Sequence, residues 1–183
     1  HTYGGIGEDN LTSMIREEDG SVTLIGYTSS FGFGNLDGLL LKCDQFGDII
    51  FARSYGDVES EVFQGIVPIP DGYLISGFSN SFNNQIFAED ILTISVNEKG
   101  KTKWSKTYGG KKSDVSLCLL KTNTEDAIII GKTESFSGRE DSDIYIIKTS
   151  ENGATSNCEQ GRVQLIDQKA DVIKNSHRPD VTD

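Results

Sequence analysis

The sequence predicts an all-β protein made of three four-stranded antiparallel repeats followed by a C-terminal tail. Two observations carry this prediction. Tyr3-Gly4-Gly5 returns as Tyr55-Gly56-Asp57, 52 residues on, and again as Tyr108-Gly109-Gly110, a further 53 residues on. Short apolar runs with period-two alternation, such as Leu92-Thr93-Ile94-Ser95-Val96, are separated by turns rich in glycine and aspartate, which is the pattern of β-strands.

The first repeat, about residues 1–54, shows four strands and the turns between them. The strands are expected at Thr12–Arg16, Ser21–Thr28, Gly38–Cys43 and Asp48–Arg53. Turn-forming residues fill the intervals, as in Glu18-Asp19-Gly20. The order of these signals predicts four consecutive antiparallel strands.

The second and third repeats, about 55–107 and 108–158, follow the same order. The second has strands expected at Phe63–Val67, Tyr73–Ser79, Ile91–Val96 and Lys101–Lys106. The third has strands expected at Ser116–Lys121, Ala127–Thr133 and Ile144–Thr149, with a short and weak fourth at Ala154–Cys158. Three sets of residues keep the same phase in all three copies: Gly26, Gly77 and Gly131; Asp37, Asp90 and Asp143; Gly47, Gly100 and Gly153.

A four-stranded repeat of this length is the size of one β-propeller blade. We therefore expect residues 1–158 to form three propeller-like blades, which leave the ring incomplete because a closed propeller needs about four to eight. The two ends would expose strand edges and apolar faces that need neighbours. Four arrangements stay open: a fragment of a larger propeller, two chains in a six-bladed ring, an open filament, or a compact stack that is not a propeller.

Two stretches also carry a resemblance to a known family. They are Lys103-Trp104-Ser105-Lys106-Thr107-Tyr108-Gly109-Gly110 and Asp143-Ile144-Tyr145-Ile146-Ile147-Lys148-Thr149. Over roughly residues 2–158 the chain resembles the propeller-like Tyr-Gly-Gly repeats of secreted and cell-surface proteins, chiefly prokaryotic. The resemblance implies a propeller-like fold, an architectural or binding role, and an extracellular or cell-surface location.

Charge and composition narrow the range of partners. The chain of 183 residues carries 17 basic and 28 acidic residues, for a formal charge of −11. Binding to nucleic acid or to an anionic membrane surface needs basic residues, and no apolar run approaches the about 18 residues of a spanning helix. We therefore expect no nucleic-acid partner and no membrane insertion. The opening His1-Thr2-Tyr3 also lacks the basic start of a signal peptide.

An enzyme is not expected. The two histidines, His1 and His177, lie near the ends of the sequence, away from a scaffold that would hold a catalytic base. The recurrence of Asp37, Asp90 and Asp143 favours a local role, in which a carboxylate accepts backbone N–H groups in a turn, over a catalytic carboxylate pair. No cofactor is expected, and the weak candidates for a calcium ligand are Asp141 and Asp143.

The sequence also predicts the state of the cysteines and one site of glycosylation. Cys43, Cys118 and Cys158 are expected to form no disulfide within the chain. The strand assignments place Cys118 and Cys158 about 14 Å apart, whereas a disulfide needs Cα atoms within about 7 Å. Asn10-Leu11-Thr12 is a sequon, which predicts N-glycosylation of Asn10.

Recurring aromatic residues are expected to pack between neighbouring repeats. This set contains Tyr3, Tyr55 and Tyr108 as wedges between blades, together with Phe31, Phe82 and Phe136. Trp104 is expected to be a partly buried packing residue, with a platform for sugar stacking as the alternative.

The C-terminal extension, residues 159–183, is predicted to donate a strand. Val163 and Leu165 alternate with Gln164 and Ile166 on the opposite face, and a second apolar cluster contains Val172 and Ile173. We expect Arg162–Lys174 to pair with a sheet edge, either that of the third repeat or that of a neighbouring chain, and to bury these four side chains there. The alternative is a linker without fixed structure.

These expectations combine into one function with one alternative. The first is a non-enzymatic extracellular or cell-surface structural protein that associates with copies of itself, or with a neighbouring repeat segment, through exposed blade edges. The association would give a dimer or an open filament. The alternative is a glycan- or protein-binding module of a larger β-propeller.

Overall fold

The chain is all-β, as predicted. The computed structural model describes residues 1–83, 85, 88–124, 126–138, 141–156, 160–162 and 165–175, and no helix occurs in these ranges. It follows that none of them contains a helix long and apolar enough to cross a membrane.

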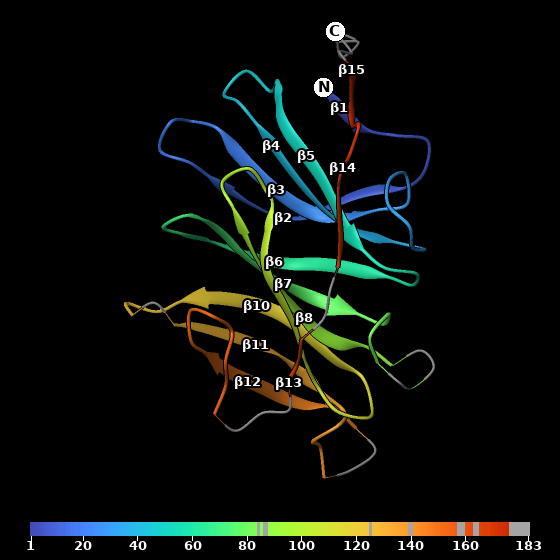
Figure 1. Cartoon of the computed structure of the whole chain (residues 1–183), viewed down its shortest axis with the longest axis vertical. Coiled ribbons are helices and arrows are strands. Elements are labelled where there is room, and N and C mark those ends of the chain that lie inside the picture. Colours follow the sequence, from blue (N-terminus) through green and yellow to red (C-terminus); the bar gives the residue numbers. More distant parts are fainter. Residues whose placement is uncertain are drawn as a thin grey trace, which may run out of the picture.

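The described strands form four antiparallel sheets, three large and one small (Figure 1). Sheet A contains β2 (Asp9–Arg16), β3 (Val22–Thr28), β4 (Asp37–Cys43), β5 (Ile49–Gly56) and β14 (Ile166–Lys169). Sheet B contains β6 (Glu61–Ile69), β7 (Gly72–Ser79), β8 (Asp90–Asn97), β9 (Thr102–Tyr108) and β13 (Gln160–Arg162). Sheet C contains β10 (Asp114–Lys121), β11 (Ala127–Thr133) and β12 (Asp143–Thr149), and β1 (Thr2–Gly4) forms a separate ribbon with β15 (Ile173–Asn175).

Sheets A, B and C share one register, including an irregularity at the same place. In each, the first strand has a shift just after the residue that pairs with a glycine of the second strand: Leu11 with Gly26, Phe63 with Gly77, and Ser116 with Gly131. A Cβ at any of these glycines would lie about 2 Å from a backbone carbonyl oxygen of the first strand, so only glycine fits. The bulge and its glycine therefore explain one of the recurring sets in the sequence.

The sheets stack one on another along the long axis of the molecule (Figure 1). Ile25 and Leu40 of sheet A pack against Phe63, Ile75 and Leu92 of sheet B in one core. Leu74 and Ile91, which face the other way in sheet B, pack against Leu119, Ile129 and Ile147 of sheet C in a second core. Alternation along each strand thus gives sheet B two buried faces.

The tail runs back along the stack and pairs with strands of three different sheets. β13 pairs with β9, β14 with β5 and β15 with β1, all antiparallel. The residues opposite the three recurring tyrosines are seven apart in the tail: Gln160 opposite Tyr108, Asp167 opposite Tyr55, and Lys174 opposite Tyr3. The tail therefore adds strands to the edges of sheets A and B of its own chain, and the expected edge of the third repeat is not among the partners of its described strands.

The third repeat has no fourth strand among its described residues. Ser150–Gly153 form the turn after β12, and residues 154–156 are not in a strand. The predicted weak strand at Ala154–Cys158 extends into positions outside the described residues. The chain is next described at β13, which pairs with β9 at the edge of sheet B and not with β12.

Candidate assembly surface

Sheet C has one face covered by sheet B and one face open to solvent. Leu119, Ile129 and Ile147 point into the core with sheet B. Their neighbours along the strands point the other way and form what we call the end face of sheet C: Cys118, Leu120, Ile128, Ile130, Ile144 and Ile146. Ile144 is 80% exposed and Ile146 is 64% exposed.

Residues at the same register positions in the other two sheets are buried. Ile146 pairs across β11–β12 as Leu40 does across β3–β4 and as Thr93 does across β7–β8, and both of these are 0% exposed. Ile144 corresponds in the same way to Ile91, which is 0% exposed. The end face of sheet C therefore has the pattern of an interior face without the neighbour.

The opposite end of the stack is half covered. Leu39 and Leu41 of sheet A are buried beneath a cluster that includes Tyr3 of β1 and Val172 of the tail. Met14 of the edge strand β2 is 64% exposed. Ile66 and Leu119 hold the same register position in sheets B and C, and both are buried. The face of sheet A is thus covered near its outer strands and open near β2.

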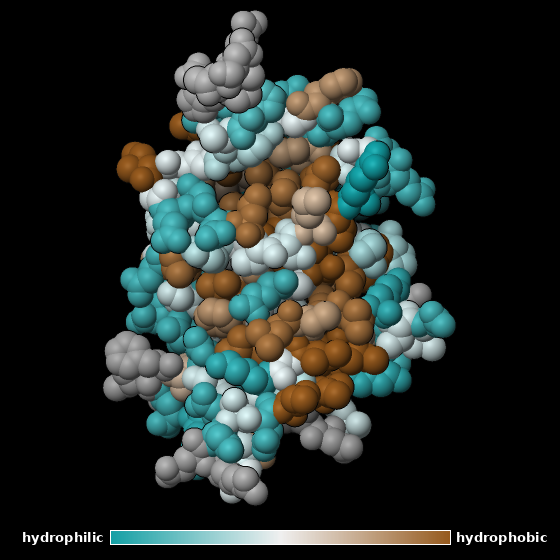
Figure 2. All heavy atoms as spheres, turned by 180° about the vertical axis from the view of Figure 1, so that it is seen from behind, coloured by the Kyte–Doolittle hydropathy of each residue, from teal (hydrophilic) through white to brown (hydrophobic). Residues whose placement is uncertain are grey.

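A cavity of about 400 Å³ lies between β1 and this face of sheet A. We call it the slot. It is lined by His1, Thr2, Tyr3, Gly4, Asp9, Asn10, Leu11, Leu39, Leu41 and Val172. The view from behind shows a band of apolar surface down the middle of the molecule (Figure 2). Exposed apolar side chains on the edge strands include Leu11, Met14, Leu117 and Leu120.

The recurring tyrosines join each sheet to the next by one repeated hydrogen bond. Tyr108 Oη, at the end of β9, donates to the carbonyl oxygen of Gly153 in sheet C at 2.7 Å. Tyr55 Oη donates to Gly100 O in the same way, and Tyr3 Oη donates to Gly47 O at 2.8 Å. The three acceptor glycines have φ of +72° to +80°, in the turns that follow β4, β8 and β12. Hence β1 sits against sheet A as β5 sits against sheet B.

β1 and β12 each have an edge without a partner among the described residues. β5 pairs with β4 on one edge and with the tail strand β14 on the other, and β9 likewise pairs with β8 and β13. β1 pairs with the tail strand β15 alone, so its other edge is open within the described structure. β12 pairs with β11 alone.

Carboxylates recur at the first residue of each large sheet, and Glu61 and Asp114 among them are buried. Asp9, Glu61 and Asp114 begin β2, β6 and β10, and each accepts a backbone N–H just after a Tyr-Gly step, at 2.8 to 2.9 Å. Each also accepts a serine hydroxyl, from Ser30, Ser79 and Ser135. These carboxylates fix the connection from one sheet to the next. Their recurrence is hard to recognise in the sequence because glutamate replaces aspartate in the second copy.

Asp37 and Asp90 face these carboxylates across Gly56 and Gly109. A Cβ at Gly109 would lie 2.3 Å from Asp90 Oδ1 and 2.8 Å from Asp114 Oδ2, so these two oxygens are within about 5 Å of each other. Burial, together with the charge of Asp114, raises the pKa of Asp90 to about 6. Burial likewise raises the pKa of Asp37 and that of Glu61.

The chemistry of these carboxylates is local. Asp37 accepts the backbone N–H groups of Phe33 and Gly34, and Asp90 accepts from the side-chain amide of Asn83 at 2.9 Å. Asp143, the third member of the recurring set, is exposed. Within the described residues, no three His, Cys, Asp or Glu side chains come together in a way that would hold a metal ion.

The other predicted site residues occupy varied positions. Asp141 is exposed, as is Asn10, whose side-chain amide donates to Tyr27 Oη at 3.1 Å. Cys43 is buried and Cys118 exposed, both as free thiols, while Cys158 and His177 lie outside the described residues. His1 is exposed beside Tyr3.

The recurring phenylalanines have unequal surroundings. Phe82 packs on the core between sheets A and B, and Phe31 packs on the cluster at the slot. Phe136 is 49% exposed and contacts the ring of Tyr145, with 5.3 Å between centroids. Trp104 is half-buried against the core between sheets B and C, so it packs there and leaves part of its surface exposed.

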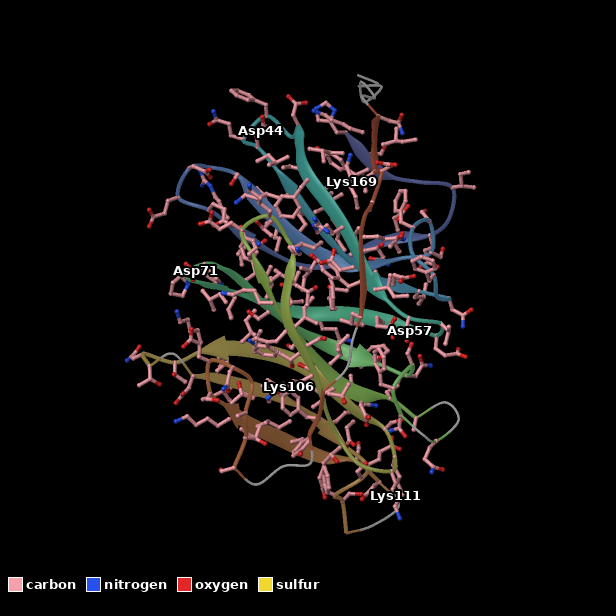
Figure 3. The ribbon with its side chains drawn as sticks, viewed as in Figure 1. Asp44, Asp57, Asp71, Lys106, Lys111 and Lys169 are labelled. Atoms are coloured by element: carbon pink, nitrogen blue, oxygen red, sulfur yellow. The ribbon has the colours of Figure 1, made fainter. Side chains whose placement is uncertain are left out.

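Asp167 of the tail links sheets A and B. Its carboxylate pairs with the Arg53 guanidinium of β5 and accepts the backbone N–H of Thr102 in β9 at 3.0 Å. Leu165 and Val172 lie in the buried clusters, Ile173 is largely exposed, and Val163 is outside the described residues. Figure 3 shows Lys106 of β9 and Lys169 of β14 along this course, with the turn residues Asp44 and Asp71 on one side of the stack and Asp57 and Lys111 on the other.

Comparison with known proteins supplies no relative: no family model matches the sequence, and no curated protein does.

Proposed function

We propose that this protein is a non-enzymatic structural repeat protein that associates with copies of itself through the two ends of its stack. In this proposal sheets A, B and C are consecutive propeller-like blades of an incomplete ring. One observation carries it: Ile144 and Ile146 are exposed on the end face of sheet C, although the same register positions are buried inside the stack. Apolar patches of this kind on a soluble protein mark interaction sites.

The arrangement of polar groups supports an architectural role over a catalytic one. The carboxylates of Asp9, Glu61 and Asp114 accept backbone N–H and serine hydroxyl groups of their own chain. Each is repeated from one junction to the next, as a part of the scaffold would be. A catalytic pair would stand in one cleft, open to a substrate.

We further propose an extracellular or cell-surface location. Its supports are the net charge of −11, the sequon at Asn10 and the resemblance to the Tyr-Gly-Gly repeats. Fractionation of the source cells, with a cytoplasmic enzyme and a known surface protein as markers, tests the location separately from association.

The experiment for the main proposal is the mass in solution. Light scattering after size-exclusion chromatography should give a mass that is a multiple of 20.0 kDa and falls toward the single chain on dilution. A mass of 20.0 kDa up to millimolar concentration would contradict self-association.

A glycan- or protein-binding module is the second candidate, and a groove favours it. The groove has a volume of about 550 Å³ and contains both aromatic and charged side chains, namely Phe51, Tyr73, Lys42, Glu17 and Asp19. Tyr73 Oη donates to Glu17 Oε1 at 2.7 Å and accepts from Lys42 Nζ at 2.9 Å, so the polar groups are held in place. A single chain that binds a glycan on an array, and loses it on Glu17→Gln, would favour this function.

A further inference from the structure

We propose that sheet C of one copy inserts into the slot of a second copy and takes the second copy's β1 as its missing fourth strand. The inference rests on the proposed self-association and specifies its joint. Among the described residues, sheet C has three strands and β12 pairs on one edge only, and the short strand β1 likewise pairs on one edge only. The two are complementary parts of one repeat.

The register of the joint follows from the other two sheets. Tyr55 of β5 stands opposite Gly38 of β4, and Tyr108 of β9 stands opposite Ile91 of β8. The residue of β12 at the same position is Ile144. The joint therefore pairs Ile144 with Tyr3 of the second copy and Ile146 with His1 of the second copy, antiparallel.

The second copy already holds β1 where a fourth strand belongs. Tyr3 Oη donates to Gly47 O, as Tyr108 Oη does to Gly153 O one junction further on. The tail strand β15 occupies the outer edge of β1, as β13 occupies that of β9. The other edge of β1 corresponds to the edge of β9 that pairs with β8. β12 would pair with this edge, so the tail strand β15 would stay in place.

The faces match as well as the edges. In the core between sheets B and C, Ile91 packs with Tyr108, Leu119 and Ile129. Their register counterparts at the joint are Ile144 of one copy with Tyr3, Met14 and Leu24 of the other. Insertion covers the exposed Met14 and Leu11 together with the end face of sheet C, so both open ends lose apolar surface to water.

Two such joints close a ring. Each copy has one end face and one slot at opposite ends of the stack, so a pair related by a two-fold axis satisfies both. The product has six large sheets, which is within the range of about four to eight that closed propellers use. Reciprocal closure leaves no apolar end exposed, whereas a filament leaves one at each terminus.

The proposed joint requires that Asn10 carry no glycan. Val62 and Val115 hold its register position in sheets B and C, and both are buried. An N-linked glycan on Asn10 would therefore occupy the space that sheet C needs. The tests below use protein made in a host that does not add N-linked glycans.

The first test changes the end face. Ile144→Glu with Ile146→Glu should halve the mass of the closed pair to 20.0 kDa and raise its dissociation constant at least tenfold. Both side chains are exposed in the single chain, so the melting temperature of the diluted variant should equal that of the diluted parent. Ile50→Glu, at a 54% exposed site of β5, is the matched control and should leave the mass unchanged.

The second test fixes the register. With Cys118 and Cys158 changed to Ser, His1→Cys with Ile146→Cys should give disulfide-linked pairs under mild oxidation, because opposite residues of antiparallel strands have Cα atoms about 4.5 to 5.5 Å apart. β1 and β12 lie at opposite ends of the stack of sheets, so the two cysteines cannot form a disulfide within one chain (Figure 1). His1→Cys with Leu117→Cys, an equally exposed site on β10, should remain unlinked.

The outcomes separate the joint from the function. Association that persists in the Ile144→Glu, Ile146→Glu variant, or that links His1→Cys with Leu117→Cys, overturns the joint and keeps self-association. A parent chain that stays at 20.0 kDa overturns both. A linked species of indefinite length, in place of the pair, overturns closure of the ring.

Discussion

Sheets B and C have the same register, the same bulge and the same glycine at that bulge, but only sheet B has neighbours on both faces. Thr93 of sheet B is 0% exposed, while Ile146 of sheet C, at the matching position, is 64% exposed. The more apolar residue is therefore the more exposed one. The comparison teaches that burial in this molecule depends on the neighbouring sheet as much as on the residue itself.

The largest expected effect compares two residues at the same register position: Leu40, which a neighbouring sheet covers, and Ile146, which is exposed. Leu40→Ala should lower the free energy of unfolding by about 2 to 5 kcal/mol because it leaves a cavity in the core between sheets A and B. Ile146→Ala should change it by less than about 0.5 kcal/mol. Urea denaturation of each variant, at a concentration at which the parent chain is not associated, makes the comparison. Equal losses would show that the open face of sheet C is covered in solution.

The next effect concerns the tail, which reaches sheets A and B but not the described strands of sheet C. Asp167→Ala should cost about 1.5 to 3 kcal/mol, because Arg53 and the Thr102 N–H then lose a charged partner. Hydrogen exchange should speed up for β5 and β9 amides and stay unchanged in β11. Asp171→Ala, at an exposed ion pair with Lys169, is the control and should be neutral. A uniform change across all sheets would mean that the tail supports the whole stack.

A smaller effect is expected where single tyrosine hydroxyls join the sheets. Tyr108→Phe removes the buried hydrogen bond to Gly153 O and should cost about 0.5 to 1.5 kcal/mol by urea denaturation. Tyr3→Phe removes the equivalent bond to Gly47 O, which is only partly buried, and should cost less. The reverse order would indicate that β1 is a stronger support than the junction between sheets B and C.

An effect of opposite sign, and one that depends on pH, is expected at the carboxylates. The folded-state pKa of Asp90, about 6, is above its ordinary value, so the folded chain gains stability as the pH falls from about 7 toward 4. Asp90→Asn lacks this gain, so the variant should be more stable than the parent at pH 8 and the difference should vanish by about pH 4. Asp143→Asn, at the exposed matching position, is the control for the substitution itself. Thermal melts across this range provide the measurement.

Much of the fold could be predicted from the sequence because each repeat carries the same local constraints. The glycine opposite the bulge cannot hold a Cβ, and Gly47, Gly100 and Gly153 have positive φ, so these residues recur wherever the backbone does. Strand alternation then follows from burial. The strand bounds differ mostly at the first strand of each repeat, where β2 begins at Asp9 and not at Thr12 because Asp9 is part of the junction.

The destination of the tail and the role of β1 could not be predicted in the same way. β13, β14 and β15 are joined to their partners through the backbone, and backbone pairing leaves little trace in residue type. The seven-residue spacing of Gln160, Asp167 and Lys174 would have been a signal only with the strand order in hand. The slot escaped prediction because it depends on three segments far apart in the sequence, namely β1, sheet A and Val172.

The pairing of β1 with β15 also has a consequence for the timing of folding. Thr2 pairs with Asn175, so β1 acquires its tail partner only after the strands of sheets A, B and C have been made. At about 5 to 20 residues per second, the roughly 170 residues from β1 to β15 take about 9 to 34 seconds to synthesise, whereas β3, the partner of β2, follows at once. The tail then docks in the reverse of the order of synthesis, on β9, then β5, then β1. The ribbon of β1 and β15 is thus completed after the three large sheets.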